Sequence, residues 1–456
     1  MALDLSRLPL KAAALSLRPM TLCDPAFVNA LAPFIDAIAI ETAPRAVRDQ
    51  WQARQLANLL RHAVARSAFW RGRIGGKSPA AIRLSALPVL TRADLRRQVE
   101  SEGALLGPAD RIQVKRHATS GSSGVPVSFF ITEVTSHLIQ VRSFAQYLLE
   151  GRDLSLNKTD LRTALTAGPG GFDLKREASW VGSLSPYLKS GALRSIKVGR
   201  PDVERLCKAL EHEPIGYLIA PPKFLEMVLR LRTPADLKRA GLAMIIPFGE
   251  AMETEMRAAF SAEGIPVRAH YSAEEFGTVG VECARVPGAY HVCESGVIVE
   301  VSDADAVIVD GQRLGRVLVT ALHSYATPFI RYDVGDLASL TQRCACGHDG
   351  PTLTNVKGRS KGFLTRADGA IVPFYLSAPI LLAICAFDEH RIRQTALDQI
   401  IVEIARKEPL DEAEIRRFHD LVAGRAGPGF AVEVRWVELI DWGAAIKRLG
   451  FRNELV

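Results

Sequence analysis

A run of hydroxyl and glycine residues between His117 and Pro126 carries the groups best suited to hold an anion. Small residues let the backbone turn tightly, so that consecutive N–H groups and hydroxyls can converge on one phosphate. The spacing differs from that of the nucleotide-hydrolase loop, because no lysine follows the last glycine. By itself such a stretch is more often a plain surface loop. The residues here that could contact a triphosphate are Thr119, Ser120, Gly121, Ser122, Ser123 and Gly124.

Three later segments carry residue types that suit the rest of a nucleotide. They read Tyr-Ser-Ala-Glu-Glu-Phe-Gly at 271–277, Arg-Tyr-Asp-Val-Gly-Asp at 331–336 and Lys-Gly-Arg-Ser-Lys at 357–361. In this order, the loop and these segments resemble the signature segments of adenylate-forming enzymes, the superfamily of acyl- and aryl-CoA ligases. Residues 51–71 and 84–95 resemble the leader of phenylacetate-CoA ligase-like proteins, which narrows the resemblance to that branch.

The resemblance implies that ATP and Mg²⁺ activate a carboxylic acid, an aromatic one by family preference, to an acyl-AMP. The acyl group would then pass to the thiol of coenzyme A. Two alternatives stay open. One is an adenylating enzyme whose acceptor is a carrier-protein thiol or an amine. The other is a degenerate protein that binds nucleotide without ligase turnover, which Val125 in place of a lysine and Glu274 in place of a hydroxyl residue would favour.

The resemblance also implies roles for single residues. Tyr271 would stack on the adenine, and Glu275 would bind Mg²⁺, a hard cation that prefers carboxylate oxygen. Asp336 would accept hydrogen bonds from both ribose hydroxyls, since a carboxylate has two acceptor oxygens. Arg359 would hold the ribose or a phosphate. Lys361 stands at the hinge about which a C-terminal lid would rotate between two steps of the reaction.

Three further assignments have ordinary structural alternatives. Gly249-Glu250-Ala251 resembles the turn that contacts adenine, but a strand-to-helix turn with Glu250 in the first helical turn explains it equally well. Lys447 is the candidate for the adenylation lysine, and an ordinary surface lysine is the alternative. Residues that flank the nucleotide motifs are candidate walls of the acid pocket, namely Phe129, Ala220, Pro221, Phe248 and His270.

Cysteines and histidines gather between two of these motifs. Zn²⁺ favours four tetrahedral thiolate or imidazole ligands, and a site without an open position is structural. Phenylacetate-CoA ligase-like proteins often carry such residues here, so the resemblance implies a structural zinc site. Unpaired thiols buried on strands are the alternative interpretation. The assigned ligands are Cys283, His291, Cys344 and Cys346, with Cys293 and His348 as alternates.

Composition limits the compartment and the partners. Hydrophobic residues make up 48% of the 456 residues, and the net charge of +7 is dispersed without a basic block, which argues against nucleic-acid binding. The sequence has no run of eighteen apolar residues, so no membrane span is predicted. The first twenty residues lack the pattern of a secretory signal peptide. Seven cysteines spread over a long chain favour a reducing cytoplasm. The partners expected are a small-molecule acid and, left open, a carrier protein or a second copy of the chain in a homodimer.

Alternating patterns predict an α/β fold with a largely parallel sheet. Strands are expected at Ile215–Ala220, Ala243–Phe248 and Val267–His270, with helices at Lys223–Leu231 and Thr254–Ala262 between them. A helical leader is expected over about residues 1–105, with Thr91 as an N-cap. Residues 295–340 are expected to be rich in β-strand.

The sequence predicts two domains. Residues 1–358 would form the large domain that binds ATP and the acid, with parallel sheets and a β-rich subdomain. Residues 359–456 would form a small, mobile α+β lid. Within the lid we expect a strand at Gln399–Ile404, a helix at Glu412–Ala423 and a strand at Ala431–Val437.

Overall fold

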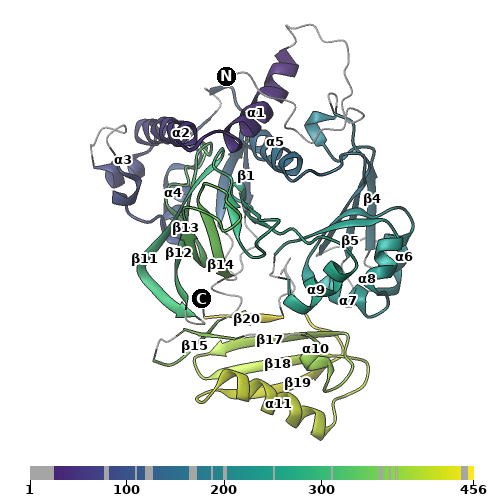
Figure 1. The fold of residues 1–456 in the computed structure, drawn as a ribbon. Coiled ribbons are helices and arrows are strands. Elements are labelled where there is room, and N and C mark those ends of the chain that lie inside the picture. Colours follow the sequence, from purple (N-terminus) through teal and green to yellow (C-terminus); the bar gives the residue numbers. More distant parts are fainter. Residues whose placement is uncertain are drawn as a thin grey trace.

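The structure is a computed structural model (Figure 1). It describes residues 25–75, 82–107, 110–118, 127–163, 172–185, 188–198, 203–249, 252–309, 312–358, 363–368, 371–374, 376, 378–442 and 450–455. The elements form three larger sheets with helices packed beside them, as an α/β fold requires. We call residues 25–358 the large unit and residues 363–455 the C-terminal unit.

The leader contains four α-helices within the described residues, and all but the first pack on an antiparallel sheet. They are α1 (Pro25–Glu41), α2 (Arg45–Arg66), α3 (Ala68–Ile74) and α4 (Arg92–Glu102). Leu59, Leu60 and Ala63 of α2 are fully buried, as their helical spacing predicts, and pack on Val317 and Val319 of the sheet. The predicted N-cap is confirmed, because the Thr91 side chain accepts from the Asp94 amide and Asp94 closes a capping box.

The antiparallel sheet contains seven strands within the described residues. Its order is β11 (Val297–Val309), β12 (Gln312–Ala321), β13 (Tyr332–Thr341), β14 (Thr352–Gly358), β10 (Tyr290–Val292), β9 (Gly277–Glu282) and β8 (His270–Ala273). The expected β-rich region is therefore confirmed. A short hairpin of β1 (Val114–Ala118) and β2 (Ser128–Thr132) packs on the same core.

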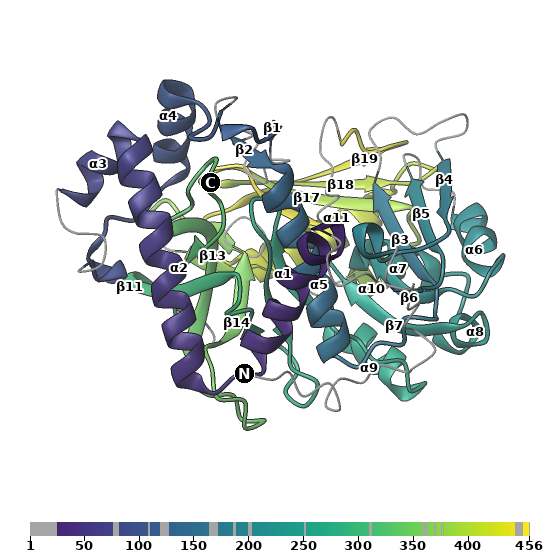
Figure 2. The ribbon, with the colours of Figure 1, turned by 90° about the horizontal axis from the view of Figure 1, so that it is seen from above.

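A second sheet is mostly parallel, as predicted. Its order is β4 (Phe172–Glu177), β5 (Leu193–Val198), β3 (Lys158–Thr163), β6 (Gly216–Ala220) and β7 (Leu242–Pro247), with only the edge strand β4 antiparallel. One face packs on α6 (Val203–Glu211), α7 (Pro222–Leu229), α8 (Pro234–Arg239) and α9 (Thr254–Ala262). The other face packs on α1 and α5 (Glu133–Leu149), which lie beside its strands in Figure 2.

One predicted strand is displaced along the chain. We expected Val267–His270, but β8 begins at His270, and Val267 forms only an isolated bridge with Ile245. The cause is local, since the Ala269 amide donates to the Glu282 side chain at 2.7 Å instead of to a neighbouring strand. The shift moves Tyr271 into the sheet.

The C-terminal unit has its own sheet and core, and lies below the two larger sheets in Figure 1. Its sheet order is β19 (Ala431–Val437), β18 (Gln399–Ala405), β17 (Glu389–Ala396) and β20 (Phe451–Asn453), with α10 (Ala378–Leu382) and α11 (Glu412–Ala426) beside it. A hairpin of β15 (Phe363–Thr365) and β16 (Ile371–Pro373) precedes it. The two predicted strands and the helix are present, and the domain boundary after Gly358 stays a prediction.

Candidate active site

The described ends of the serine- and glycine-rich stretch are β1 and β2, whose last pair is Ala118 with Ser128. Phe129 packs against Phe329 with ring centroids 5.7 Å apart, and Phe329 packs against Tyr332 at 5.3 Å. The Phe130 amide donates to the Thr327 hydroxyl at 2.9 Å. The base of the hairpin therefore packs beside the segment that leads into β13, although Thr119 to Gly124 lie outside the described residues.

Tyr271 and Asp336 meet, although β8 and β13 are not neighbours in the sheet. The Tyr271 hydroxyl donates to Asp336 Oδ2 at 2.8 Å. Burial, and then the Asp336 carboxylate, raise the pKa of Tyr271 well above its usual value, so the phenol stays protonated and remains a donor. Gly335 beside it has φ +83°, a conformation that favours glycine, and its amide donates to Asp333 Oδ1 at 2.9 Å.

Glu275 and Tyr332 lie next to this pair. Glu275 is buried, and the Tyr332 hydroxyl donates to its Oε1 at a long 3.5 Å. Burial, followed by the Glu275 carboxylate, raises the pKa of Tyr332. The neighbouring Glu274 is exposed. The turn after β8 thus directs one glutamate inward and leaves the other in solvent.

Three of the predicted pocket residues, Ala220, Pro221 and Phe248, lie at the carboxyl ends of parallel strands, whereas Phe129 lies on β2 and His270 on β8. Ala220 pairs with Pro247, and the Phe248 amide donates to the Ala220 carbonyl at 3.3 Å, so β6 and β7 end side by side. The Arg162 guanidinium lies 3.9 Å from the centre of the Phe248 ring. In α/β sheets this edge is where ligands bind. Phe129 and Ala220 themselves are buried in the core.

His270 is held by a charged pair. Its Nε2 lies 2.9 Å from Arg152 Nη2 and 3.1 Å from Glu150 Oε1. Arg152 is itself buried, with its guanidinium 3.9 Å from the centre of the Tyr147 ring. His270 Nε2 therefore either accepts from Arg152 or donates to Glu150, depending on its tautomer. Gly249, after β7, has φ +82°.

A cavity of about 250 Å³ lies between α5 and the parallel sheet, and none of the five predicted pocket residues lines it. Its walls include Phe144 and Tyr147 of α5 together with Lys158 and Trp180. Tyr147 also packs on His270, with ring centroids 5.6 Å apart, so the cavity adjoins the predicted pocket. The sequence feature that could have indicated this cavity is the spacing of Phe144 and Tyr147, which stand three residues apart on α5.

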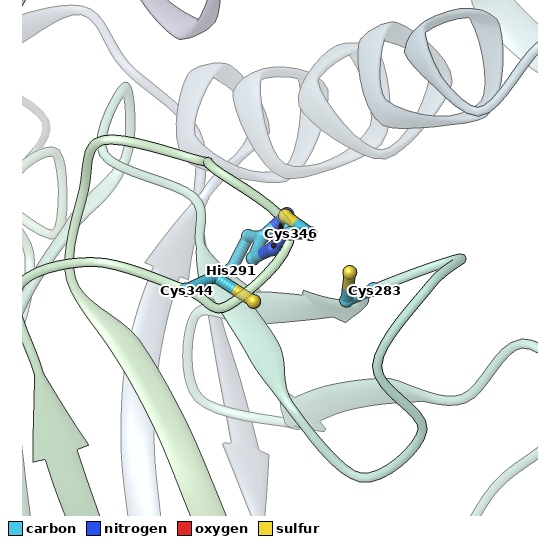
Figure 3. A group of neighbouring side chains, drawn as sticks. All are labelled: Cys283, His291, Cys344 and Cys346. Carbon is cyan, nitrogen blue, oxygen red and sulfur yellow. Dashed lines mark hydrogen bonds between the residues drawn. The ribbon is translucent and has the colours of Figure 1, made fainter.

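The predicted metal ligands come together at one end of the antiparallel sheet (Figure 3). Cys283 follows β9, His291 lies on β10, and Cys344 and Cys346 belong to the turn between β13 and β14. Their ligand atoms all lie within 4.8 Å of one another. The Cys346 sulfur also accepts from the His348 amide, and the Cys283 sulfur from the Arg285 amide, both at 3.4 Å. Three sulfurs and one imidazole nitrogen form a set that suits tetrahedral Zn²⁺.

A buried ion pair supports this cluster from the leader. His348 stacks on His291 with ring centroids 4.1 Å apart and is not in the ligand group. Arg48 of α2 donates to the fully buried Glu294 at 2.8 Å and to the Asp349 carbonyl. Sequence reasoning missed Arg48 and Glu294, because 246 residues separate them and neither lies in a motif. Cys293, an alternate ligand, is buried but also outside the group.

Several predicted site residues lie outside the described part of the chain, so their roles stay predictions. Besides the serine- and glycine-rich stretch, these are Glu250, Ala251, Arg359, Lys361 and Lys447.

Comparisons with known proteins agree with this fold. No protein-family model matches the chain. It is 25% identical over 397 residues to phenylacetate-coenzyme A ligase from Thermus thermophilus, which covers 83% of this chain and 82% of that protein. The fold matches the crystal structure of 2-hydroxyisobutyryl-CoA ligase in its postadenylation state, with a TM-score of 0.63, 19% identity and 91% of each chain covered.

A further structure of that ligase, with an acyl-AMP and CoA in the thioesterification state, matches with a TM-score of 0.56 at 19% identity, over 91% of this chain and 92% of that one. Among the described residues, no helix combines the length and apolar character needed to cross a membrane.

Proposed function

We propose that this chain, which belongs to the phenylacetate-CoA ligase-like branch of the adenylate-forming superfamily, is an AMP-forming acid–CoA ligase. A carboxylate oxygen attacks the α-phosphorus of ATP, the bond to pyrophosphate breaks, and an acyl-AMP forms. The coenzyme A sulfur then attacks the acyl carbon, and AMP leaves as the thiol loses its proton. Both steps depend mainly on positioning and on neutralising charge.

The observation that carries the proposal is the contact between Tyr271 and Asp336 beside the buried Glu275. Asp336 would accept from the ribose hydroxyls, and the face of the Tyr271 ring would cover the adenine. Glu275 would bind Mg²⁺ together with the phosphates. The hydroxyls between Thr119 and Ser123 would hold the phosphates, and Lys447 would approach the reacting carboxylate.

The remaining roles follow the same arrangement. Gly249, Glu250 and Ala251 would contact the adenine, Arg359 the ribose or phosphate, and Lys361 would serve as the hinge. Phe248, Pro221 and His270 would border the acid, with Phe129 and Ala220 behind them. An aromatic acid is the substrate class that we propose, since the ring of Phe248 and the adjoining α5 aromatics offer apolar surface.

The cysteine and histidine cluster would hold a structural zinc ion. Cys283, His291, Cys344 and Cys346 fit the metal by donor type, because thiolate and imidazole are its preferred ligands. Burial raises the pKa of the Cys344 thiol to about 11, so metal binding would have to displace its proton. We also place the protein in the cytoplasm. A homodimer and a carrier-protein acceptor stay predictions.

Pyrophosphate–ATP exchange tests the function. We expect exchange that depends on an aromatic acid, and AMP release that rises when coenzyme A is added. AMP release that responds instead to a carrier protein or an amine would point to that acceptor. The degenerate alternative, which Val125 favours, requires ATP binding without exchange for any acid in the panel, and that result would contradict the proposal.

A further inference from the structure

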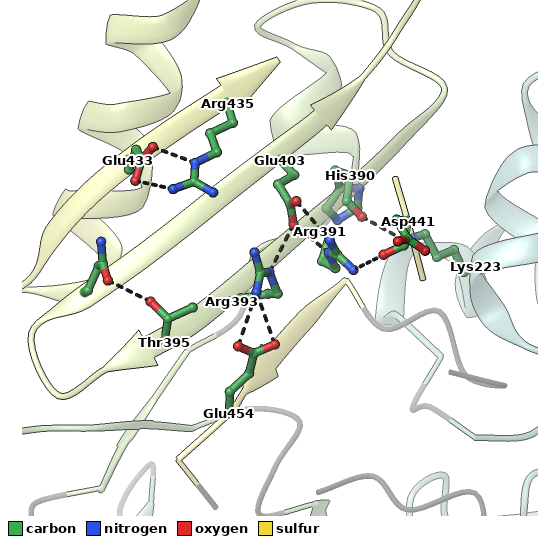
Figure 4. Close-up of polar contacts among 11 residues, drawn as sticks. Lys223, His390, Arg391, Arg393, Thr395, Glu403, Glu433, Arg435, Asp441 and Glu454 are labelled. Atoms are coloured by element: carbon green, nitrogen blue, oxygen red, sulfur yellow. Dashed lines mark hydrogen bonds and ion pairs between the residues drawn. The ribbon is translucent and has the colours of Figure 1, made fainter. Parts of the chain in front are cut away.

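A lysine of the large unit is buried against the C-terminal unit. Lys223 lies in the first turn of α7, directly after the carboxyl end of β6, and is only 7% exposed. Its Nζ donates to the main-chain carbonyl of His390, at the start of β17, with a distance of 2.8 Å. Figure 4 shows this lysine reaching the C-terminal sheet beside His390 and Asp441. A buried ammonium is unfavourable unless polar or aromatic groups compensate for its lost hydration.

An aromatic ring provides that compensation. The Lys223 ammonium lies 4.6 Å from the centre of the Trp442 ring, and the Arg391 guanidinium lies 5.2 Å from the same ring. The ring is held in place, since its Nε1 donates to Glu389 Oε2 at 3.3 Å and Arg391 donates to the Asp441 carbonyl at 2.7 Å. Cation–π contacts of this kind strengthen when the cation is removed from water.

A second cation, at the other end of α7, also contacts the C-terminal unit. Arg230 follows α7 by one residue and donates to the carbonyls of Phe387 and Asp388. Residues seven apart lie on the same face of a helix, so Lys223 and Arg230 both face the start of β17. The two units therefore meet through directed cation-to-carbonyl contacts at Phe387 and Asp388, just before β17, and at His390 within it. We call the contacts of Lys223 and Arg230 the α7 clamp.

The clamp lies beside two residues that flank 443–449 in the sequence. Trp442 precedes residues 443–449, and Gly450 follows them. A Cβ on Gly450 would lie 3.0 Å from His390 Nε2, so this glycine packs directly on the histidine that Lys223 contacts. Burial, with Lys223 and Arg230 nearby, lowers the pKa of His390 well below its usual value, so its ring is neutral and adds no charge to the contact.

We infer that Lys223 is a positioning residue for acyl-adenylate formation. It holds the C-terminal unit, through His390 and Trp442, against the carboxyl edge of the parallel sheet where the acid and nucleotide would react. This role rests on the proposed ligase function. It does not require Lys223 to touch either substrate.

The Lys223→Met variant tests the inference, because methionine keeps the length and apolar stem but removes the charge and the donor. We expect acid-dependent pyrophosphate–ATP exchange to fall about tenfold or more through kcat, with the ATP dissociation constant within about twofold of wild type. Thioester formation from a supplied acyl-AMP and coenzyme A should stay within about twofold. Lys223→Arg, which retains a donor and a cation, should recover most of the exchange rate.

A structural readout accompanies the kinetics. Amide hydrogen exchange in a peptide spanning Phe387 to Arg391 should accelerate about tenfold in the methionine variant, since the clamp no longer restrains the start of β17. Lys208→Met is the matched control, because Lys208 lies on α6 of the same unit, is 70% exposed and pairs only with the exposed Glu204 among the described contacts. It should change neither measurement.

Three results would overturn the inference: an unchanged exchange reaction, equal losses in the adenylate-forming and thioester-forming steps, or unchanged hydrogen exchange near β17. The two proposals fail differently. A wild-type protein without exchange for any acid refutes the ligase function, whereas a clamp without effect on β17 refutes the positioning role even if the ligase is active.

Discussion

Single residues acquire their chemistry here from the carboxylates beside them. Tyr271 would be an ordinary partly buried phenol without Asp336, and Tyr332 an ordinary core tyrosine without Glu275. In each pair the phenol is the donor, because burial and the neighbouring negative charge raise the tyrosine pKa. The carboxylates are thereby oriented before any ligand binds.

Replacing Asp336 by Ala should weaken ATP binding by at least about a hundredfold, because a carboxylate that accepts from two hydroxyls contributes roughly 1.5–3 kcal/mol per bond. Tyr271→Phe keeps the ring and removes only the orienting hydrogen bond, so a loss of about threefold to tenfold is expected. Calorimetric titration with ATP measures both. Asp303→Ala, at a side chain that is 77% exposed, is the control. Unchanged ATP affinity in Asp336→Ala would remove the ribose assignment.

Glu41, the last residue of α1, predicts a pH dependence of stability. Its Oε1 accepts from the Ser295 amide at 2.9 Å, and burial, which outweighs that bond, raises the pKa of Glu41 from 4.5 to about 7. A carboxyl group whose pKa is higher in the folded state than in the unfolded state stabilises the fold in its protonated form. This contribution is complete at pH values below the unfolded-state pKa. That contribution is lost as the pH rises from 4.5 through 7.

Glu41→Gln, which stays neutral, should therefore gain about 1–2 kcal/mol in unfolding free energy relative to wild type between pH 5 and pH 8. Urea unfolding at the two pH values measures the difference. The exposed Glu408→Gln provides the comparison, with no such change expected. A constant difference between Glu41→Gln and wild type across this range would show that Glu41 titrates normally.

Among elements, the turn between β13 and β14 depends most on its connections. It carries Cys344 and Cys346, which meet Cys283 and His291 in the cluster, and its end is joined to β10 by the Val292 amide, which donates to the Pro351 carbonyl. A bound metal would cross-link the three segments that carry these ligands through its coordination bonds, as structural zinc sites do.

Cys344→Ser should lower the zinc content from about one ion per chain towards none, with a fall of several degrees in melting temperature. Elemental analysis of protein purified without chelator, together with calorimetry, checks both. Cys385→Ser alters a thiol outside the cluster and should keep its zinc. Wild-type zinc stoichiometry in Cys344→Ser would argue against this metal site.

At the scale of the whole molecule, the C-terminal unit has an apolar core of its own. Ile400, Val402, Ile404 and Phe418 are fully buried within it, and none of these residues packs in a core of the large unit. Its contact with the large unit at the α7 clamp is polar instead, since Lys223 and Arg230 donate to main-chain carbonyls. A unit with its own core and a polar interface can fold independently.

A fragment of residues 363–456 should therefore fold alone and unfold cooperatively on heating, with helical and strand signals in its circular dichroism spectrum. Phe418→Ala in the same fragment should lose about 3–5 kcal/mol and abolish the cooperative transition. A fragment without a transition would mean that the large unit is needed to fold it.

Local patterns in the sequence were sufficient for most of the elements that it predicted. Thr254–Ala262 and Ala431–Val437 have the predicted bounds, and α11 extends three residues beyond its predicted end to a Gly427 cap with φ +82°. Periodicity and capping depend on residues a few positions apart, so one sequence contains the whole signal. Val267–His270 was misplaced because a side chain from Glu282 takes the amide that a strand would use.

By itself, the sequence determined the type of the helices and strands that it predicted and which four cysteine and histidine side chains gather, because residue types and their order are written along the chain. Tertiary structure alone decided that Tyr271 donates to Asp336, 65 residues away, and that Lys223 reaches His390, 167 residues away. The physical reason is that such contacts depend on how whole sheets curve and pack, and no local spacing records the distance between their edges.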